Sequence, residues 1–384
     1  MTNSVIDKSA FDLIYLTFCA LNSVKVDVER LKSMQPAQIY ELGERHSLNA
    51  LVSYAMEGNI NDQAYVRWKK AREQSLRRNI LLDMEGRHLC KVMDEKGIWH
   101  MRLKGSVLKD LYPHMEMRQM TDQDILFDTT HRDEMREYML ARGYDPKGHH
   151  DTHHDIYHKE PIYNMELHHT LFELHCDLRL VNYYRNVKEE RMIPDNDGTM
   201  GFHFSDEDFY IYMVGHAYKH YMDHGAGLRS LVDVYVFDSQ KPQLDWDYVE
   251  RECEKLGMAD YEKTCRSVAR KLFRDNAPET LTEAEIEMVD FCVDSGTHGN
   301  EEGYIRHELK GVGAKGKITF GQKMKYIWKR LFPSAKWMRE NDRLARKHAL
   351  LLPVAWIVRL FRGIFKRGDH TSKEFRYVMN TEEV

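Results

Sequence analysis

The chain has 384 residues, of which 42% are hydrophobic, 30% are charged and nine are proline. This composition is typical of folded globular domains and excludes disordered and fibrous classes. At the usual ~150 residues per domain, the length predicts two or three compact units. The six cysteines form no CxxC pair, which argues against a zinc knuckle or a disulfide framework and indicates reduced thiols in a cytoplasmic protein.

Neither a signal peptide nor a membrane span is expected. Residues 1–8 lack a basic segment before an apolar run, and the longest apolar run, 349–358, is interrupted by Pro353. That run is also shorter than the ~20 residues that cross a bilayer.

Charge is concentrated near the C-terminus. The formal net charge is -5, yet residues 310–368 hold 16 Lys or Arg and two acidic residues. Such a basic segment can contact an anionic partner, either nucleic acid or a membrane surface, or it can pack against the acidic remainder of the chain. We favour packing, because the segment is rich in tryptophan and leucine. Packing predicts burial of six apolar side chains: Ile327, Trp328, Phe332, Trp337, Leu351 and Trp356.

The first 97 residues show helical periodicity. Residues 10–21 are apolar with a helical period, and a long helix capped by Asp62 is expected to end at Gly97. Within it, Leu76, Ile80 and Met84 recur every four residues, and Leu89, Val92 and Met93 continue the same stripe, which predicts a buried face.

Strand patterns begin at Ile98. The sequence predicts a strand at 98–103, a Gly turn at 104–106 and a short helix at 107–111. A second strand at 125–127 and a helix at 130–143 follow. A β-hairpin with arms at 155–158 and 162–168 comes next, and further helices begin at 205. The predicted class is therefore α+β, with a mixed-sheet core flanked by helical regions. The expected divisions are 1–97, 98–200, 201–309 and a basic helical segment, 310–384.

Carboxylates gather on two of these strands. Asp122 and Asp124 project from the same side of a strand, because alternate residues share a face. Two adjacent carboxylates on an apolar strand repel each other unless a cation neutralises them, so the pair suggests a divalent metal. Glu166 shares its strand face with Asn164 and His168 and can supply a third carboxylate.

The strand-to-helix turn before these aspartates has the composition of a phosphate-binding turn. Gly105 allows close backbone approach, and Ser106 offers a hydroxyl to phosphate oxygens.

These motifs resemble the uncharacterised nucleotidyltransferase family, a branch of the polymerase-β-like superfamily. The similarity extends over 98–237, with Gln123 in place of an aliphatic residue and 15 residues between Ser106 and Asp122 as departures. The matching segments are Leu103–Ser106, Leu111–Pro113, Arg118, Asp122–Leu126, Met165–His168 and a helical stretch from Glu207 to Asp233.

The resemblance implies an α+β nucleotidyltransferase fold and a two-metal site. Asp122, Asp124 and Glu166 would hold two Mg²⁺ ions, with Mn²⁺ as an alternative, and Glu166 would help to deprotonate the acceptor. The reaction would move a nucleoside monophosphate from a nucleoside triphosphate to a hydroxyl on a small molecule, a protein or RNA. The nucleotide would be bound by Lys104, Gly105, Ser106 and Arg118. The alternative is a catalytically silent module of the same fold that binds nucleotide or nucleic acid.

Four further residues are weaker candidates for the site: His168, His220, Arg229 and Asp233. His168 shares the face of Glu166, while His220 lies one turn after His216, and Arg229 and Asp233 form another i,i+4 pair. These helical residues would either close over the nucleotide or form a core histidine beside a helix salt bridge, and we favour the second interpretation.

Histidines are dense between 149 and 175. They suggest a zinc site as one alternative, but a solvated loop is the interpretation that we favour.

Overall fold

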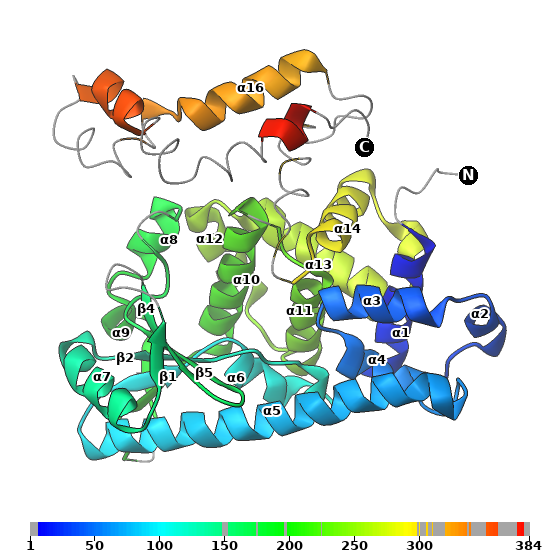
Figure 1. Ribbon diagram of the computed structural model, residues 1–384, viewed down its shortest axis with the longest axis horizontal. Helices are drawn as coiled ribbons and strands as arrows, with labels where there is room; N and C mark the ends of the chain where they lie inside the picture. The colour runs from blue at the N-terminus through cyan, green and yellow to red at the C-terminus, as the bar shows by residue number, and fades with distance from the viewer. Residues whose placement is uncertain are drawn as a thin grey trace. The chain divides into compact units, whose positions relative to one another are not determined.

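The computed structural model describes most of the chain up to residue 297 and shorter stretches after it (Figure 1). The described residues form two compact units, one within 1–222 and 226–297 and the other within 223–225 and 298–384. None of the described helices is long and apolar enough to cross a membrane. The described ranges are 7–147, 153–173, 176–195, 198–223, 225–297, 299, 305, 309, 319–335, 338, 351–359 and 375–379.

Helices make up the start of the first unit, as the sequence predicts. They are α1 (Lys8–Leu21), α2 (Val28–Lys32), α3 (Pro36–Arg45), α4 (Asn49–Met56) and α5 (Asp62–Glu95). The cap of α5 is Asn61, one residue earlier than predicted, because its side chain accepts a hydrogen bond from the Ala64 amide. Gly97, with a φ of 69°, follows the helix end as expected.

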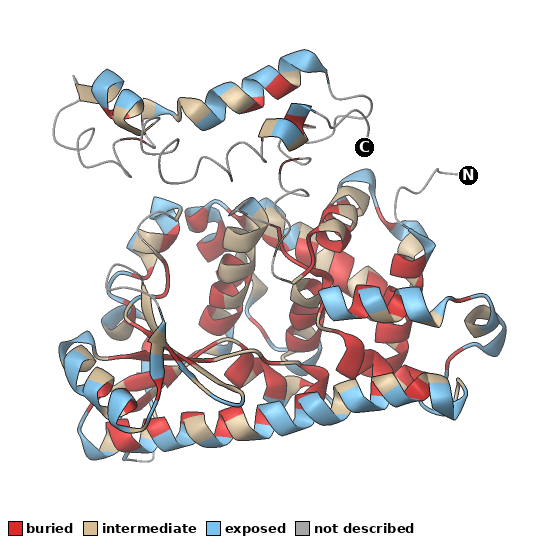
Figure 2. Ribbon diagram, in the orientation of Figure 1, coloured by how far each residue is buried: buried red, intermediate tan, exposed pale blue. Residues whose placement is uncertain are grey.

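The predicted buried face of α5 is confirmed for Leu89, Val92 and Met93 but is wrong for its first part. Leu76, Ile80 and Met84 are 36%, 42% and 64% exposed, and Figure 2 shows α5 exposed along one side of its length. The buried face instead mixes apolar residues with polar ones such as Asn79, whose amide donates to the carbonyls of Met115 and Arg118. Polar residues that satisfy neighbouring backbone groups therefore occupy positions that hydrophobic periodicity alone leaves to solvent.

A seven-stranded mixed sheet forms the centre of the α+β part, which confirms the predicted class. Its order is β3-β4-β5-β2-β1-β7-β6, in which β2 runs parallel to β5 and β1 parallel to β7, while the other pairs are antiparallel. The strands are β1 (His100–Arg102), β2 (Gln123–Phe127), β3 (Asp145–Lys147), β4 (His154–Lys159), β5 (Tyr163–His168), β6 (Met192–Pro194) and β7 (Gly201–Phe204). The hairpin is where the sequence predicts it, whereas β3, β6 and β7 are additional short strands.

The two faces of the sheet differ in chemistry. Ile125 and Phe127 of β2 join Met165 and Leu167 of β5 in an apolar cluster with side chains of α5 and α7 (Arg132–Ala141). The alternate residues, including Asp124 and Glu166, therefore face the other side, and the predicted alternation is confirmed.

Gln123 lies on the α5 side of β2 and packs over Gly86. A Cβ at Gly86 would lie 2.8 Å from the Gln123 amide, so the glycine makes room for this unusual polar residue.

The remaining elements of the first unit are mainly helices. The short elements are α6 (Gly105–Leu108), η1 (Lys109–Leu111), η2 (Met115–Met117), η3 (Thr129–His131), α8 (Leu178–Tyr183), α9 (Val187–Glu190) and η4 (Pro278–Thr280). The longer ones are α10 (Asp206–Asp223), α11 (Leu228–Gln240), α12 (Trp246–Leu256), α13 (Ala259–Phe273) and α14 (Glu283–Ser295). All six cysteines are free thiols, as the sequence predicts.

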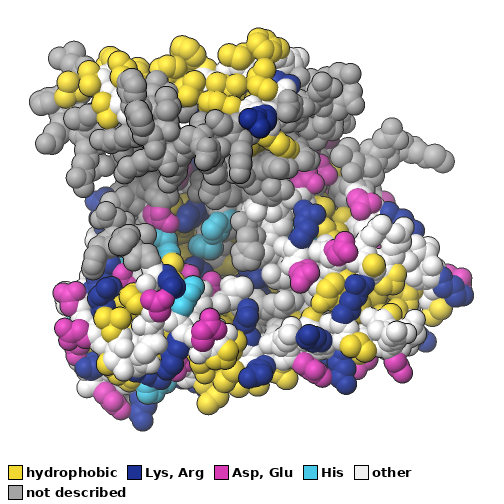
Figure 3. Space-filling view, in the orientation of Figure 1, with side chains coloured by type: hydrophobic (Ala, Val, Ile, Leu, Met, Phe, Trp, Pro, Cys, Tyr) yellow, Lys and Arg dark blue, Asp and Glu magenta, His cyan; other side chains and the backbone are white. Residues whose placement is uncertain are grey.

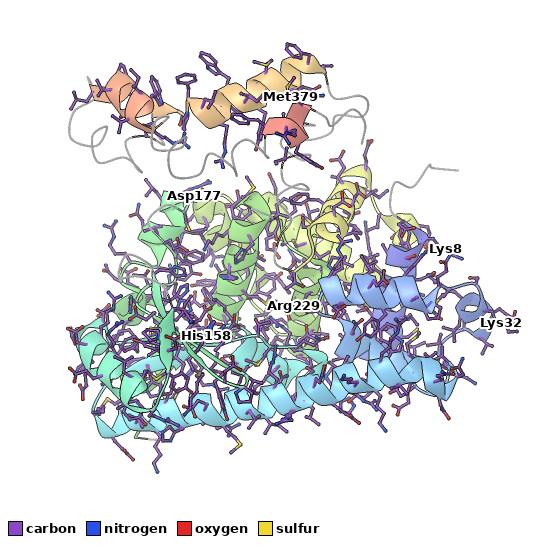
Figure 4. The ribbon with its side chains drawn as sticks, in the orientation of Figure 1. Lys8, Lys32, His158, Asp177, Arg229 and Met379 are labelled. Carbon is purple, nitrogen blue, oxygen red and sulfur yellow. The ribbon has the colours of Figure 1, made fainter. Side chains whose placement is uncertain are left out.

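The second unit contains α16 (Phe320–Leu331), which begins with a capping box between Thr319 and Gln322. Its buried face carries Lys323 and Tyr326, and the Lys323 ammonium donates to the carbonyl of Met379, labelled in Figure 4. Trp328 lies on the other side and is 64% exposed, so its predicted burial is wrong. Four of the other predicted core residues are partly buried: Ile327, Phe332, Leu351 and Trp356. Trp337 and the glycine-rich stretch 311–316 lie outside the described residues.

Candidate active site

Three side chains meet on the polar face of the sheet. The parallel register of β2 and β5 places Asp124 beside Glu166, and His168 lies two residues further along β5. Asp124 Oδ1 accepts a hydrogen bond from His168 Nε2 at 2.7 Å, and Glu166 Oε2 lies 3.6 Å from the same nitrogen. One ligand atom of each lies within 4.8 Å of the other two, so these residues form a group that can hold a metal ion.

Lys104 reaches this group from the turn after β1. Its Nζ donates to Asp124 Oδ1 at 2.6 Å. The residue has a φ of 49°, a conformation that is unfavourable for a side chain with a Cβ and that is found in tight turns and functional sites. The predicted role of Lys104 in binding triphosphate remains a prediction, but its ammonium does lie at the carboxylate cluster.

Ser106 has an internal role in this turn. Its hydroxyl donates to the Leu103 carbonyl at 2.6 Å, and the side chain is buried. The hydroxyl proton therefore stabilises the turn, and contact of Ser106 with phosphate remains a prediction.

Asp83 of α5 forms ion pairs with residues on both sides of the Lys104 turn. Its Oδ1 lies 2.6 Å from an Arg102 guanidinium nitrogen and 3.0 Å from the Lys109 ammonium, and the Lys109 side chain is fully buried. Arg102 also donates to the Ser106 carbonyl at 3.0 Å. One buried carboxylate thus connects the long helix to both ends of the strand-turn-helix unit.

The pKa values of Asp122 and Asp124 shift in opposite directions. Burial alone would raise the pKa of Asp124. The charge of Lys104 and the hydrogen bond from His168 outweigh the effect of burial, and the Asp124 pKa therefore lies below its usual value. Asp122, just before β2, has its pKa raised to about 6 by burial and by the negative charges of Asp124 and Glu166. Asp124 is therefore the carboxylate that Lys104 and His168 stabilise in its ionised form, whereas the ionised form of Asp122 is disfavoured.

This arrangement fits a divalent cation. Mg²⁺ binds oxygen ligands, and the structure brings the carboxylates of Asp124 and Glu166 together with His168, whereas Asp122 is not part of this group. Burial and the charges of Asp124 and Glu166 raise the pKa of Asp122 more than Lys104 and Arg229 lower it, and a cation bound nearby would favour its ionised form.

Arg118 and Asp233, both predicted from the sequence, lie together in a buried network. Arg118 Nε donates to Asp233 Oδ1 at 2.7 Å, and the Tyr112 hydroxyl donates to the same oxygen at 2.6 Å. Asp233 is therefore paired with Arg118, and the predicted Arg229–Asp233 salt bridge on one helix is wrong. Arg229 of α11, labelled in Figure 4, instead donates to the Gln119 carbonyl at 3.2 Å. Burial and the charge of Arg118 lower the pKa of Arg229 to about 10.

Helix α10 contributes side chains that sequence reasoning did not fully identify. His216 Nε2 and His220 Nε2 lie 3.3 Å apart, so this predicted i,i+4 contact is confirmed. Burial and the charge of Lys104 lower the pKa of His216 well below its usual value, so this ring is neutral. Tyr212, one turn earlier, was not predicted; its ring lies 6.3 Å from that of His216, and burial raises its pKa.

The histidines before the hairpin are not all part of a solvated loop. His153 and His154 are half-buried beside His168, which corrects the favoured loop interpretation for these two residues. In the space-filling view, histidine side chains lie in a hollowed part of this face (Figure 3). His149, His150 and His175 lie outside the described residues.

Comparison with known proteins agrees with this geometry. The chain matches the family described as "Uncharacterised nucleotidyltransferase" over residues 32–274, which include the sheet, the carboxylate cluster and α10 to α13. No curated protein and no solved structure matches the chain. The match covers more than half of the sequence and includes the motifs from which the resemblance was inferred. The chain therefore belongs to the uncharacterised nucleotidyltransferase family.

Proposed function

We propose that the protein is a Mg²⁺-dependent enzyme that transfers a nucleoside monophosphate from a nucleoside triphosphate to a hydroxyl acceptor. The observation that carries the proposal is the meeting of Asp124 and Glu166 in parallel register, with Asp122 near enough for their charges to raise its pKa. Family membership supports the reaction class. In this reaction the acceptor oxygen forms a bond to the α-phosphorus, the bond to the β-phosphate oxygen breaks, and pyrophosphate leaves.

Asp122, Asp124 and Glu166 would hold the metal. A Mg²⁺ pair supplies positive charge that polarises the α-phosphate and stabilises the attacking and leaving oxygens, and Mn²⁺ can supply the same chemistry. His168 keeps Asp124 in one orientation through its 2.7 Å hydrogen bond. Glu166, whose carboxylate is partly accessible, is the candidate acceptor for the hydroxyl proton.

Lys104 is the candidate group for triphosphate charge. It lies 2.6 Å from Asp124, and the Asp124 charge overcomes the effect of burial and raises the Lys104 pKa, so the ammonium stays protonated. A permanent positive charge beside the carboxylates can bind a phosphate oxygen of an incoming nucleotide.

Gly105→Ala tests the role of the turn in nucleotide binding. A Cβ there would lie 3.6 Å from Met120 Cγ and 3.7 Å from an Arg118 guanidinium nitrogen, which are ordinary contacts, so the fold should tolerate alanine. If the backbone at Gly105 approaches the phosphates, the methyl group will obstruct them. We expect at least about tenfold weaker ATP binding at unchanged thermal stability, roughly 1.4 kcal/mol of binding free energy.

Gly321→Ala in α16 is the matched control, because a Cβ there has only one neighbour, at 3.9 Å. Titration calorimetry on both variants gives the affinities. Equal ATP affinity in the Gly105→Ala variant and the wild type would show that the turn has only a structural role.

Label transfer tests the proposed activity. The full-length protein is incubated with Mg²⁺, a cell extract and each nucleoside triphosphate labelled at the α-phosphate, and the labelled product is then identified as small molecule, protein or RNA. We expect label on an acceptor with one preferred nucleotide, and none when Mg²⁺ is chelated.

A thermal-shift titration separates the enzyme from the silent binding module. Ligand at one hundred times its Kd stabilises a protein by about 2.7 kcal/mol, whether or not it reacts. Stabilisation by nucleotide without label transfer would support the silent module, and absence of both would contradict the nucleotide site itself.

A further inference from the structure

A cluster of three histidines lies beside the carboxylates, and two of them, His153 and His154, have no part in the reaction proposed above. His153 directly precedes β4, His154 is its first residue, and the antiparallel register pairs His154 with His168 of β5. The ring centroids are separated by 4.1 Å (His153–His154), 4.9 Å (His154–His168) and 5.3 Å (His153–His168). One nitrogen of each ring lies within 4.8 Å of the others.

The positions of the ring nitrogens are those of a ligand set. His153 Nε2 and His154 Nδ1 face each other at 2.9 Å. The other nitrogen of His153, Nδ1, lies 3.0 Å from Glu173 Oε1. This carboxylate places negative charge beside the His153 ring, which favours a bound cation.

His168 supplies the second, independent sign of a ligand. Its Nε2 is bonded to Asp124, while its Nδ1 is buried and has no hydrogen-bond partner among the described residues. A buried polar atom without a partner costs about 1–3 kcal/mol, which a bound ion would offset.

The surrounding charge also suits a cation. Glu173 lies beside His153, and Glu166 Oε2 is 3.7 Å from His154 Nε2.

We propose that His153, His154 and His168 form a second site, which shares His168 with the carboxylate group, for a divalent transition-metal ion of the Zn²⁺ class. Imidazole is a preferred ligand of Zn²⁺, whereas Mg²⁺ prefers oxygen, so this site and the carboxylate site select different ions. Three histidine ligands leave a fourth tetrahedral position for water or another ligand. The ion would hold β4 against β5 and fix His168, which orients Asp124. This proposal does not depend on nucleotidyl transfer.

Co²⁺ tests the proposal, because tetrahedral Co²⁺ with nitrogen ligands absorbs visible light and substitutes for Zn²⁺. The full-length, metal-free protein is titrated with Co²⁺ in excess Mg²⁺, which occupies the oxygen ligands. We expect one equivalent of Co²⁺ with visible absorption, displaced by Zn²⁺, and at least about tenfold weaker binding in His153→Gln and His154→Gln.

His158→Gln is the matched control. His158 lies on the same strand, is exposed and is labelled in Figure 4, and this variant should bind Co²⁺ as the wild type does. Equal Co²⁺ affinity in the His153 and His154 variants, or no Co²⁺ binding by the wild type, would overturn the proposal.

Asp122→Asn separates this proposal from the proposed function. Asp122 is outside the histidine cluster, so we expect the variant to keep its Co²⁺ absorption whether or not the protein transfers nucleotide. Loss of the absorption in this variant would place the ion among the carboxylates and contradict a second site.

Discussion

We expect the Asp122→Asn substitution to lower the rate of Mg²⁺-dependent nucleotidyl transfer by at least about 100-fold without loss of stability. Groups that merely support metal ligands are worth about 10–100-fold, so removal of a ligand charge should cost at least as much. The amide keeps the volume of the side chain and removes a charge that burial and neighbouring carboxylates disfavour. Initial rates of label transfer and chemical denaturation of the metal-free variant give the two results.

The pH dependence of stability provides a second readout of Asp122. Its pKa is about 6 in the folded protein and about 3.9 in an unfolded chain, so the folded state binds more protons between these values. This carboxyl therefore lowers the free energy of unfolding as pH rises from about 4 to about 6, with no further change above. The Asn variant lacks this decrease, so its stability relative to the metal-free wild type should rise over the same interval.

Asp133→Asn on the exposed surface of α7 is the control, and it should change neither transfer nor stability. Wild-type transfer rates in the Asp122 variant would show that this carboxylate is not a metal ligand. Asp124→Asn should also abolish transfer, but it should destabilise the fold because Lys104 and His168 lose their common acceptor.

Asp83→Ala is expected to destabilise the first unit by about 3–5 kcal/mol, since removal of one partner leaves a buried charge uncompensated. Here the charge that loses its carboxylate is mainly that of Arg102, whose side chain is mostly buried beside Asp83, because the Lys109 ammonium also lies 2.7 Å from Asp110 Oδ1. Loss of the anchor should also loosen the Lys104 turn and weaken ATP binding. Urea denaturation followed by circular dichroism measures the stability.

Glu73→Ala on the exposed face of the same helix is the matched control. Glu73 makes only a 4.0 Å surface contact with Lys69, so its removal should cost at most about 0.5 kcal/mol. Similar stability losses in the two variants would contradict the anchoring role of Asp83.

The central strands could be predicted from the sequence because β5 alternates strictly between polar and apolar residues and β2 does so in part, with Gln123 and Leu126 as exceptions. Asp124 and Glu166 are polar positions within apolar strands, and two-residue periodicity places them on one face, as observed. The Gly turn and the hairpin have local signals of the same kind. Short strands such as β6 and β7, with three and four residues, lack enough positions to show a period.

Other features depend on contacts between distant segments. The buried face of α5 includes Asn79 and Asp83, which are satisfied by partners that no helical pattern reveals. The meeting of His154 with His168 follows from the hairpin register, and the pairing of Arg118 with Asp233 joins residues 115 positions apart. Composition identifies the residue types in these cases, but the tertiary structure selects the partners.

The position of the transferred label tests the central claim most directly. Parallel reactions contain Mg²⁺, an acceptor identified by label transfer and the preferred nucleoside triphosphate, labelled at either the α- or the γ-phosphate. Nucleotidyl transfer predicts that the α-label appears on the acceptor and the γ-label in pyrophosphate, and that both signals disappear in Asp122→Asn. Appearance of the γ-label on the acceptor would instead show phosphoryl transfer and would contradict the proposed reaction.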